Sequence, residues 1–227
     1  MVVPDLASVS RALAQVAANA NCSLVRVGVT DSAEAVVSGL VGDGTPESLL
    51  RTAVHDAAPR GMTWQVRGIN STYCPALDTL RPIYQRGSSM SVMLVGGKDR
   101  LRQGEAIRPV ITMPAFPGHL QVDYLSHDGS VSHLFPSSGA PDKLLAGGAK
   151  LFIGQGKNGV GTVGAPYGTD MIIAVASSVP LFPAGAPKDD DDTVDRYLPK
   201  LQAAITAAER HGAQVSGNAF ALETVER

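Results

Sequence analysis

Apolar positions in the first third of the chain change their spacing several times, and each change predicts a new element. Over residues 5–20 they recur every three or four positions, which is the spacing of one helix face. Over residues 24–30 and 34–42 they alternate with small or polar residues, which predicts the two strands of a hairpin. Thr45 and Pro46 then predict the cap and the first turn of a second helix, which Pro59 and Gly61 would end.

The same part of the chain closes with one more strand and one more helix. Residues 63–69 predict the strand, and a short helix beginning at Pro75 would bury Leu77 and Leu80. The order helix, strand, strand, helix, strand, helix predicts a small α/β sandwich in which helices cover one face of the sheet.

This pattern resembles the bacterial BON-type domain, which also occurs in secretin-like periplasmic modules. The residues that carry the resemblance are 24–29 and 36–41 of the hairpin and the strand residues 63–67. Residues 85–89 have the composition of a linker. We therefore expect two domains, a BON-like domain over residues 1–86 and a second domain over residues 87–227.

The second domain is predicted to be rich in short strands. From Ile107 onward, brief apolar runs are separated by Pro, Gly, Asp or Ser, which is typical of an antiparallel sandwich. Residues 96–105 are expected to form a polar turn region, and His127, Asp128 and Gly129 a hairpin turn. The predicted strands are residues 90–95, 122–125, 131–135, 151–153, 160–163 and 170–176.

A helix and a strand are expected to complete this domain. Leu198, Leu201 and Ile205 have helical spacing, and Pro199 suits the first turn of that helix better than its interior. Gly212 would end the helix, and residues 215–225 predict a last strand that returns to the sheet. The acidic residues 189–192 before the helix are expected to form a solvated loop. The predicted class is α+β, an α/β BON-like sandwich followed by an antiparallel β-sandwich with a C-terminal helix and strand.

Charge and cysteine content narrow the classes of function. A net charge of -2 and a pI near 6.2 provide no basic field, so we expect no nucleic-acid partner. No run of apolar residues is long enough to span a bilayer, and residues 1–7 lack the features of a signal peptide. A membrane would be reached only through an anchor in a larger parent protein.

Cys22 and Cys74 permit one disulfide or none, and we favour the bridge because both lie at element ends of one domain. A reactive thiol at Cys74, near a helix start, is the alternative.

Two patterns suggest chemistry without requiring it. Residues 154–159 match G-x-G-x-x-G, with Lys157 as the assisting cation, but the residues that follow cannot continue as the helix that a phosphate site needs. His127 and His133 flank a hairpin with Asp123 and Asp128 nearby. Histidine and aspartate are residue types that can bind zinc. His133 is expected to share a strand face with Val131 and Phe135 while His127 lies in the turn. We therefore interpret both histidines as structural or surface residues and predict no metal.

The second domain is similar to a bacterial domain of unknown function, number 4384 in its catalogue, whose members are attached to receptor-like Ser/Thr kinases and to caspase-like peptidases. Seven short segments of residues 103–182 carry the resemblance. They are residues 104–105, 120–125, 127–131, 134–136, 145–147, 166–170 and 172–177.

The resemblance implies a sensory or binding region, since the chain has no kinase signatures of its own. We expect a non-enzymatic, periplasmic or otherwise extracytoplasmic part of a kinase-associated signalling protein, without cofactors, that binds a protein or an envelope component. A cytoplasmic location is the alternative. His127, Asp128, Tyr167 and Lys157 are the candidate binding residues, because they lie in predicted loops. A metal-assisted hydrolase and a structural component of a secretion system are the competing hypotheses.

Overall fold

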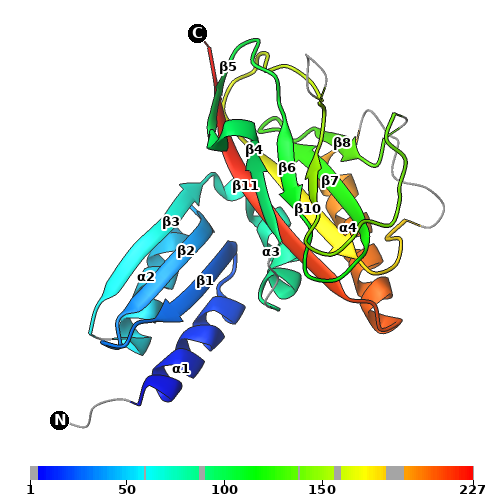
Figure 1. Cartoon of the computed structure of the whole chain (residues 1–227). Coiled ribbons are helices and arrows are strands. Elements are labelled where there is room, and N and C mark those ends of the chain that lie inside the picture. Colours follow the sequence, from blue (N-terminus) through cyan, green and yellow to red (C-terminus); the bar gives the residue numbers. More distant parts are fainter. Residues whose placement is uncertain are drawn as a thin grey trace. The chain divides into compact units, whose positions relative to one another are not determined.

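The computed structural model describes residues 5–58, 60–86, 90–137, 139–155, 160–182 and 192–226. Within them the chain forms two compact units that divide between Gln85 and Arg86, and Figure 1 labels most of their helices and strands. The predicted α+β class is confirmed, because four α-helices accompany sheets with both parallel and antiparallel pairings. No helix in the described part of the chain has the length and apolar content needed to cross a bilayer.

The first unit is a three-stranded sheet with two helices on one face. Strands β1 and β2 pair antiparallel, β2 and β3 pair parallel, and β2 lies between the other two. Leu13 of α1 and Val54 of α2 pack against Val25 and Val37 of the sheet, so the predicted amphipathic faces are buried here. Its elements are α1 (Leu6–Asn19), β1 (Ser23–Val29), β2 (Ala35–Gly42), α2 (Thr45–Ala57), β3 (Met62–Ile69), the 3-10 turn η1 (Ser71–Tyr73) and α3 (Cys74–Tyr84).

One predicted helix cap is wrong. Thr45 is the first residue of α2, and Gly44 occupies the cap position with a φ of 80°, so no side chain caps this helix. A positive φ of this size is readily adopted by glycine, which explains why the chain turns one residue earlier than Thr45 suggests. The first helix is capped as its sequence indicates, because the Asp5 carboxylate accepts a hydrogen bond from the Ala7 amide.

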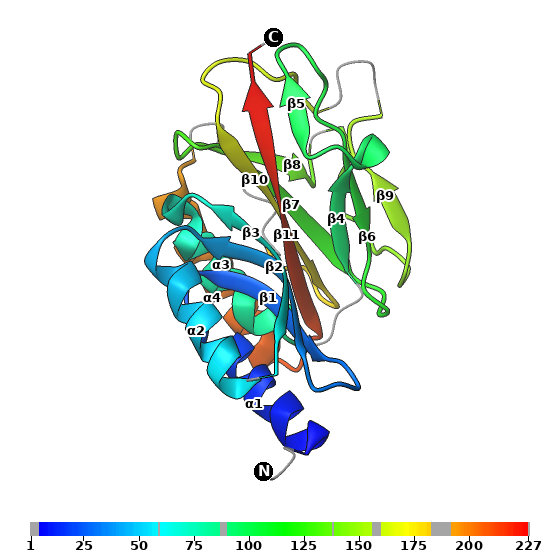
Figure 2. The ribbon, with the colours of Figure 1, turned by 90° about the vertical axis from the view of Figure 1, so that its left-hand side faces the viewer.

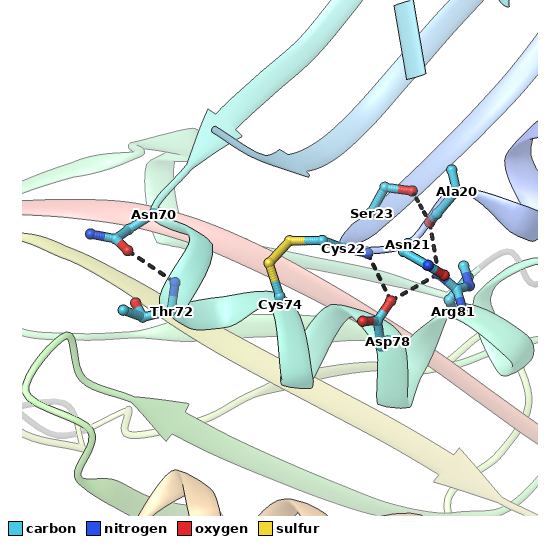
Figure 3. Close-up of a disulfide and its surroundings, with 9 residues drawn as sticks. All are labelled: Ala20, Asn21, Cys22, Ser23, Asn70, Thr72, Cys74, Asp78 and Arg81. Atoms are coloured by element: carbon cyan, nitrogen blue, oxygen red, sulfur yellow. Dashed lines mark hydrogen bonds and ion pairs between the residues drawn. A yellow bond between two sulfur atoms is a disulfide. The ribbon is translucent and has the colours of Figure 1, made fainter. Parts of the chain in front are cut away.

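A disulfide joins the turn after α1 to the start of α3 in the first unit, as Figure 3 shows. Cys22 lies in the turn after α1 and Cys74 is the first residue of α3. The Asp78 carboxylate of α3 accepts hydrogen bonds from the Cys22 amide at 2.8 Å and from Arg81 at 2.8 Å. Arg81 also donates to the Ala20 carbonyl at 2.7 Å. The start of α3 is therefore held to the α1–β1 turn by covalent and polar bonds together.

The second unit is a sandwich of a five-stranded and a three-stranded sheet, with one helix outside it. The strand orders are β5-β11-β10-β7-β8 and β4-β6-β9, and Figure 2 shows β4, β6 and β9 side by side. Its elements are β4 (Ser91–Leu94), the 3-10 turn η2 (Val95–Gly97), β5 (Arg100–Arg102), β6 (Pro109–Thr112), β7 (His119–Leu125), β8 (Val131–Phe135), β9 (Lys150–Phe152), β10 (Thr169–Ser177), α4 (Val194–Arg210) and β11 (Val215–Val225).

Two strand predictions in this unit are wrong. The predicted polar turn region contains the short strand β5, which pairs parallel with β11. Conversely, residues 160–163 form no strand, and Thr162 makes only an isolated bridge with Ala106. Glycine at position 161 weakens strand propensity in this segment, whereas β5 is held in place by its long neighbour β11.

The two faces of the five-stranded sheet have different neighbours. Ile172, Ala174 and Ala176 of β10 belong to the core between the two sheets. The alternate residues of β10 point the other way, because side chains alternate across a strand. On that second face Tyr197 of α4 reaches Asp123 of β7, so the helix packs outside the sandwich.

The C-terminal helix begins earlier than its proline suggests. We predicted a start near Pro199, but α4 begins at Val194. Pro199 lies in the second turn of the helix and is exposed to solvent. The missing amide of Pro199 removes one backbone bond near the helix start, and the buried Tyr197 and Leu198 offset that loss. Gly212, with a φ of 78°, follows the last turn as predicted, and β11 rejoins the sheet beside β10.

Candidate functional site

The β7–β8 hairpin brings the predicted binding residues His127 and Asp128 into one turn. Asp128 is engaged within that turn, where its carboxylate accepts hydrogen bonds from the Ser130 amide at 2.9 Å and the Ser130 hydroxyl at 2.7 Å. These bonds stabilise the charged form and lower the pKa of Asp128. Asp128 therefore shapes the turn through its Oδ1 atom.

His127 is held by a buried carboxylate at the start of β10. Its ring Nδ1 and its backbone amide both lie 2.9 Å from Asp170 Oδ1. Asp170 Oδ2 accepts further bonds from the hydroxyls of Tyr124 at 2.6 Å and Thr224 at 3.1 Å. Asp170 thus joins the hairpin turn to β7, β10 and β11, and only the Nε2 edge of His127 could meet a ligand.

Of the other two predicted binding residues, Tyr167 alone lies within the described part of the chain. Tyr167 is half-buried and packs against the core of the sandwich. The next residue, Gly168, lies so close to the His127 ring that a Cβ there would approach it to 3.0 Å. Lys157 lies outside the described residues, as does most of the G-x-G-x-x-G segment.

A second carboxylate on the α4 face of the sheet collects three donors. Asp123 of β7 accepts hydrogen bonds from Gln121 at 2.6 Å, from His133 Nδ1 at 2.7 Å and from the Tyr197 hydroxyl. The His133 and Tyr197 rings meet edge to face at 4.9 Å. Burial, followed by the nearby Asp123 charge and its hydrogen bond, raises the pKa of Tyr197 well above 10.0, so Tyr197 remains a donor.

The expectation that His133 shares a strand face with Phe135 is wrong, because the strand register shifts between them. Phe135 pairs with Val122 and faces the sandwich core, whereas His133 pairs with Asp123 and faces α4. A register shift between Val122 and Asp123 separates the two side chains. Simple alternation along β8 could not reveal such a bulge.

The expected solvation of the acidic segment is wrong for Asp192, its one described residue. The Asp192 side chain is 1% exposed and lies 3.4 Å from Lys200 Nζ and 3.7 Å from Arg196 Nε. Its other neighbour is His133, whose Nε2 is 3.9 Å away. His133 therefore lies between two buried carboxylates, Asp123 and Asp192. A run of aspartates alone predicts a solvated loop. The cations near Asp192, Arg196 and Lys200, lie on the helix that follows, so the run itself did not reveal them.

The two histidines that suggested a metal centre are held apart by different carboxylates, Asp170 and Asp123. Among the described residues, no group of three or more His, Cys, Asp or Glu side chains is arranged to hold a metal ion. The pair of His127 and Asp170 holds the hairpin turn in place, and Asp123, which binds His133 and Tyr197, holds α4 against the sheet.

A groove of about 670 Å³ lies beside this buried cluster and was not anticipated from the sequence. His133, Leu134 and Phe135 of β8 line one side of it, and Leu151 and Phe152 of β9 line another. β8 and β9 are the edge strands of the two sheets. Lys143 lies at this groove, and the Phe152 side chain is 47% exposed. The groove is thus a hollow of mixed apolar and polar lining between two sheet edges.

Comparison with known proteins identifies one segment of the chain. No curated protein matches the chain. Residues 100–180, which run from β5 past the end of β10 and include the hairpin, Asp170 and the groove, match the family described as Domain of unknown function (DUF4384).

Proposed function

We propose that the second unit is a non-enzymatic binding module that receives an extended segment of a protein partner in the groove between β8 and β9. The observation that carries this proposal is the position of the groove at two sheet edges. An extended peptide can add to a sheet edge through its backbone while its side chains fill adjacent pockets.

The backbone of β9 is suited to such an addition. The Ile153 amide donates to the Pro109 carbonyl of β6, and alternation along the strand turns the backbone groups of Phe152 away from β6. No described residue pairs with those Phe152 groups. A partner strand along β9 would satisfy them and would cover the exposed Phe152 ring.

Charge at the groove indicates the chemistry of the partner. Lys143 has no ion-pair partner in the described part of the chain. The neighbouring carboxylate of Asp142 is bonded to His119 Nδ1 at 2.8 Å and is therefore engaged elsewhere. An apolar segment that carries a carboxylate would complement both the lining and the unpaired lysine.

The hydrolase hypothesis gains no support from this geometry. It requires His127 and His133 on one ion, and a shared ion would have to displace the bonds to both Asp170 and Asp123. The hypothesis of a structural role in a secretion system predicts stable self-association of the chain. The groove between β8 and β9 bears on partner binding and not on that hypothesis.

We place this module in a larger signalling protein, with the first unit as a BON-like domain and a Ser/Thr kinase as the associated activity. The support for an extracytoplasmic location is the disulfide, since such bonds persist in oxidising compartments. A cytoplasmic location remains the alternative.

A displayed library of random short peptides tests the proposal directly. We expect enrichment of peptides that combine apolar residues with an acidic one. Phe152→Asp and Lys143→Glu should each weaken their binding about tenfold, because one removes the apolar anchor and the other reverses the charge. Binding is measured by fluorescence polarisation with the purified full chain.

The matched control is Leu49→Asp, which alters an exposed apolar residue on α2 of the first unit. It should leave peptide binding unchanged. Failure to enrich any peptide, or equal binding by the Phe152→Asp variant, would contradict the groove as the binding surface.

A further inference from the structure

The strand β3 has an open edge in the first unit. The carbonyls of Gly61 and Ile69 accept hydrogen bonds from Ala35 and Asp43 at the two ends of β2. Because backbone groups alternate in direction along a strand, the residues at odd positions of β3 face β2 and those at even positions face outward. The outward residues are Met62, Trp64, Val66 and Gly68.

These outward groups have no partner in the described part of the chain. The opposite edge of the sheet differs, because the Val25 carbonyl of β1 accepts a hydrogen bond from the Gln85 side chain at 2.9 Å. Helix α3 also contacts β1, and Arg26 of β1 stacks on Tyr84 of α3 at 4.8 Å. One edge of this small sheet is therefore partly covered, whereas no described residue of the first unit pairs with the other edge, β3, which Figure 1 shows as the outer strand.

β3 has few of the features that usually protect an edge. Natural edge strands are short, carry charged residues or proline, or contain a bulge. β3 has eight residues and no proline, Arg67 is its one charged residue, and it pairs with β2 in continuous register from Met62 to Ile69. A strand of this kind is suited to pair with another strand.

We propose that β3 pairs antiparallel with β3 of a second copy of this chain, about a two-fold axis at Gln65. In this register Trp64 of one copy lies opposite Val66 of the other, and Thr63 lies opposite Arg67. Aromatic and β-branched residues are favourable cross-strand neighbours, and no like charges oppose each other. A shift of the axis to Val66 would instead place Trp64 opposite Gly68, which has no side chain.

The flanking helix is compatible with this pairing. Arg51 of α2 stacks over the Trp64 ring at 4.0 Å and forms an ion pair with Glu47 at 2.9 Å. Each copy therefore brings a neutral pair beside Trp64, and the Asp43 carboxylate lies farther along the same face, next to Gly68. The two sheets would join into one continuous sheet with no bare edge at β3.

The axis at Gln65 allows a sharp test. Gln65 is exposed and would lie directly opposite its symmetry mate, where cross-strand side chains approach most closely. Gln65→Lys and Gln65→Glu each place like charges together, so each should weaken the dimer about tenfold or more. An equal mixture of the two variants should dimerise again, because it places opposite charges together.

Sedimentation velocity of the full chain at micromolar concentration is the measurement. Thr52→Lys is the control, since Thr52 is exposed on α2 away from the sheet, and this variant should dimerise as the unchanged chain does. A monomeric unchanged chain would overturn the proposal. So would dimers that persist in both Gln65 variants, or a mixture that stays monomeric.

Discussion

Buried carboxylates do much of the positioning in the second unit. Asp170 and Asp123 lie on β10 and β7, and each accepts hydrogen bonds from groups distant in sequence. A buried charge is costly unless donors surround it, so each carboxylate fixes its donors in place. Asp170 fixes the hairpin turn with His127, and Asp123 fixes the start of α4 through Tyr197.

Removing the Tyr197 hydroxyl should therefore destabilise the protein. Tyr197→Phe leaves Asp123 buried with one donor fewer, and we expect the free energy of unfolding to fall by about 1–3 kcal/mol. Urea unfolding followed by circular dichroism measures this. Tyr167→Phe is the control, because that half-buried hydroxyl has no hydrogen bond to the described residues. Equal stability of the two variants would contradict the role given to Tyr197.

The pH dependence of the same residue has a definite sign. The pKa of Tyr197 in the folded protein lies above its ordinary value of 10.0, so above about pH 10 the unfolded chain loses this proton while the folded chain keeps it. The unfolded state is then favoured, and stability falls as the pH rises. Tyr197→Phe should lack this part of the alkaline loss, which urea unfolding at a series of pH values would show.

Gly42 leaves the space that the disulfide occupies. A Cβ at this position would lie 2.3 Å from Cys22 Sγ and 3.2 Å from Cys74 Sγ. We expect Gly42→Ala to leave free thiols and to lower stability by about 2–4 kcal/mol, the usual contribution of a disulfide that closes a long loop. Thiol titration under denaturing conditions measures the first effect. Gly28→Ala on β1 is the control, since a Cβ there meets nothing within 4 Å. A fully oxidised Gly42→Ala chain would refute this account.

At the scale of elements, Pro199 is the residue that misled the prediction of α4. Proline is favoured in the first turn of a helix and disfavoured inside it, so Pro199 indicated a start that the structure does not have. We expect Pro199→Ala to stabilise the protein by about 1–3 kcal/mol, because the alanine amide can bond to the Asp195 carbonyl. Thermal unfolding tests this, and an unchanged or lower midpoint would show that the proline is accommodated at no cost.

Long periodic elements were predictable because local pattern and buried face agree in them. The helix over Leu6–Asn19 and the hairpin of β1 and β2 show this agreement. The short strand β5 has only three residues and is defined by its neighbour β11, which lies far away in sequence. The same limit applies to the candidate site. The sequence indicated His127 and Asp128, whereas Asp170, Tyr197 and the groove depend on long-range contacts and had no local pattern.

At the scale of the whole molecule, the two units use their sheets differently. In the first unit the sheet is small and one long edge is bare, which suits pairing with another strand. In the second unit the edges of two sheets flank a groove with Lys143, which forms no ion pair with the residues that the structure describes, and this suits an extended acidic and apolar segment. Self-association and partner binding are thus assigned to separate surfaces, and their tests are independent.

The bond between Cys22 and Cys74 also determines how the chain would bear tension. A pull applied across the chain ends would pass through the sulfur atoms and bypass the sheet of the first unit. The two cysteines are 52 positions apart. While the bond is intact, the segment between them cannot extend, and its extended length is on the order of 180 Å. Reduction would release that length, and only then would β1, β2 and β3 carry mechanical load.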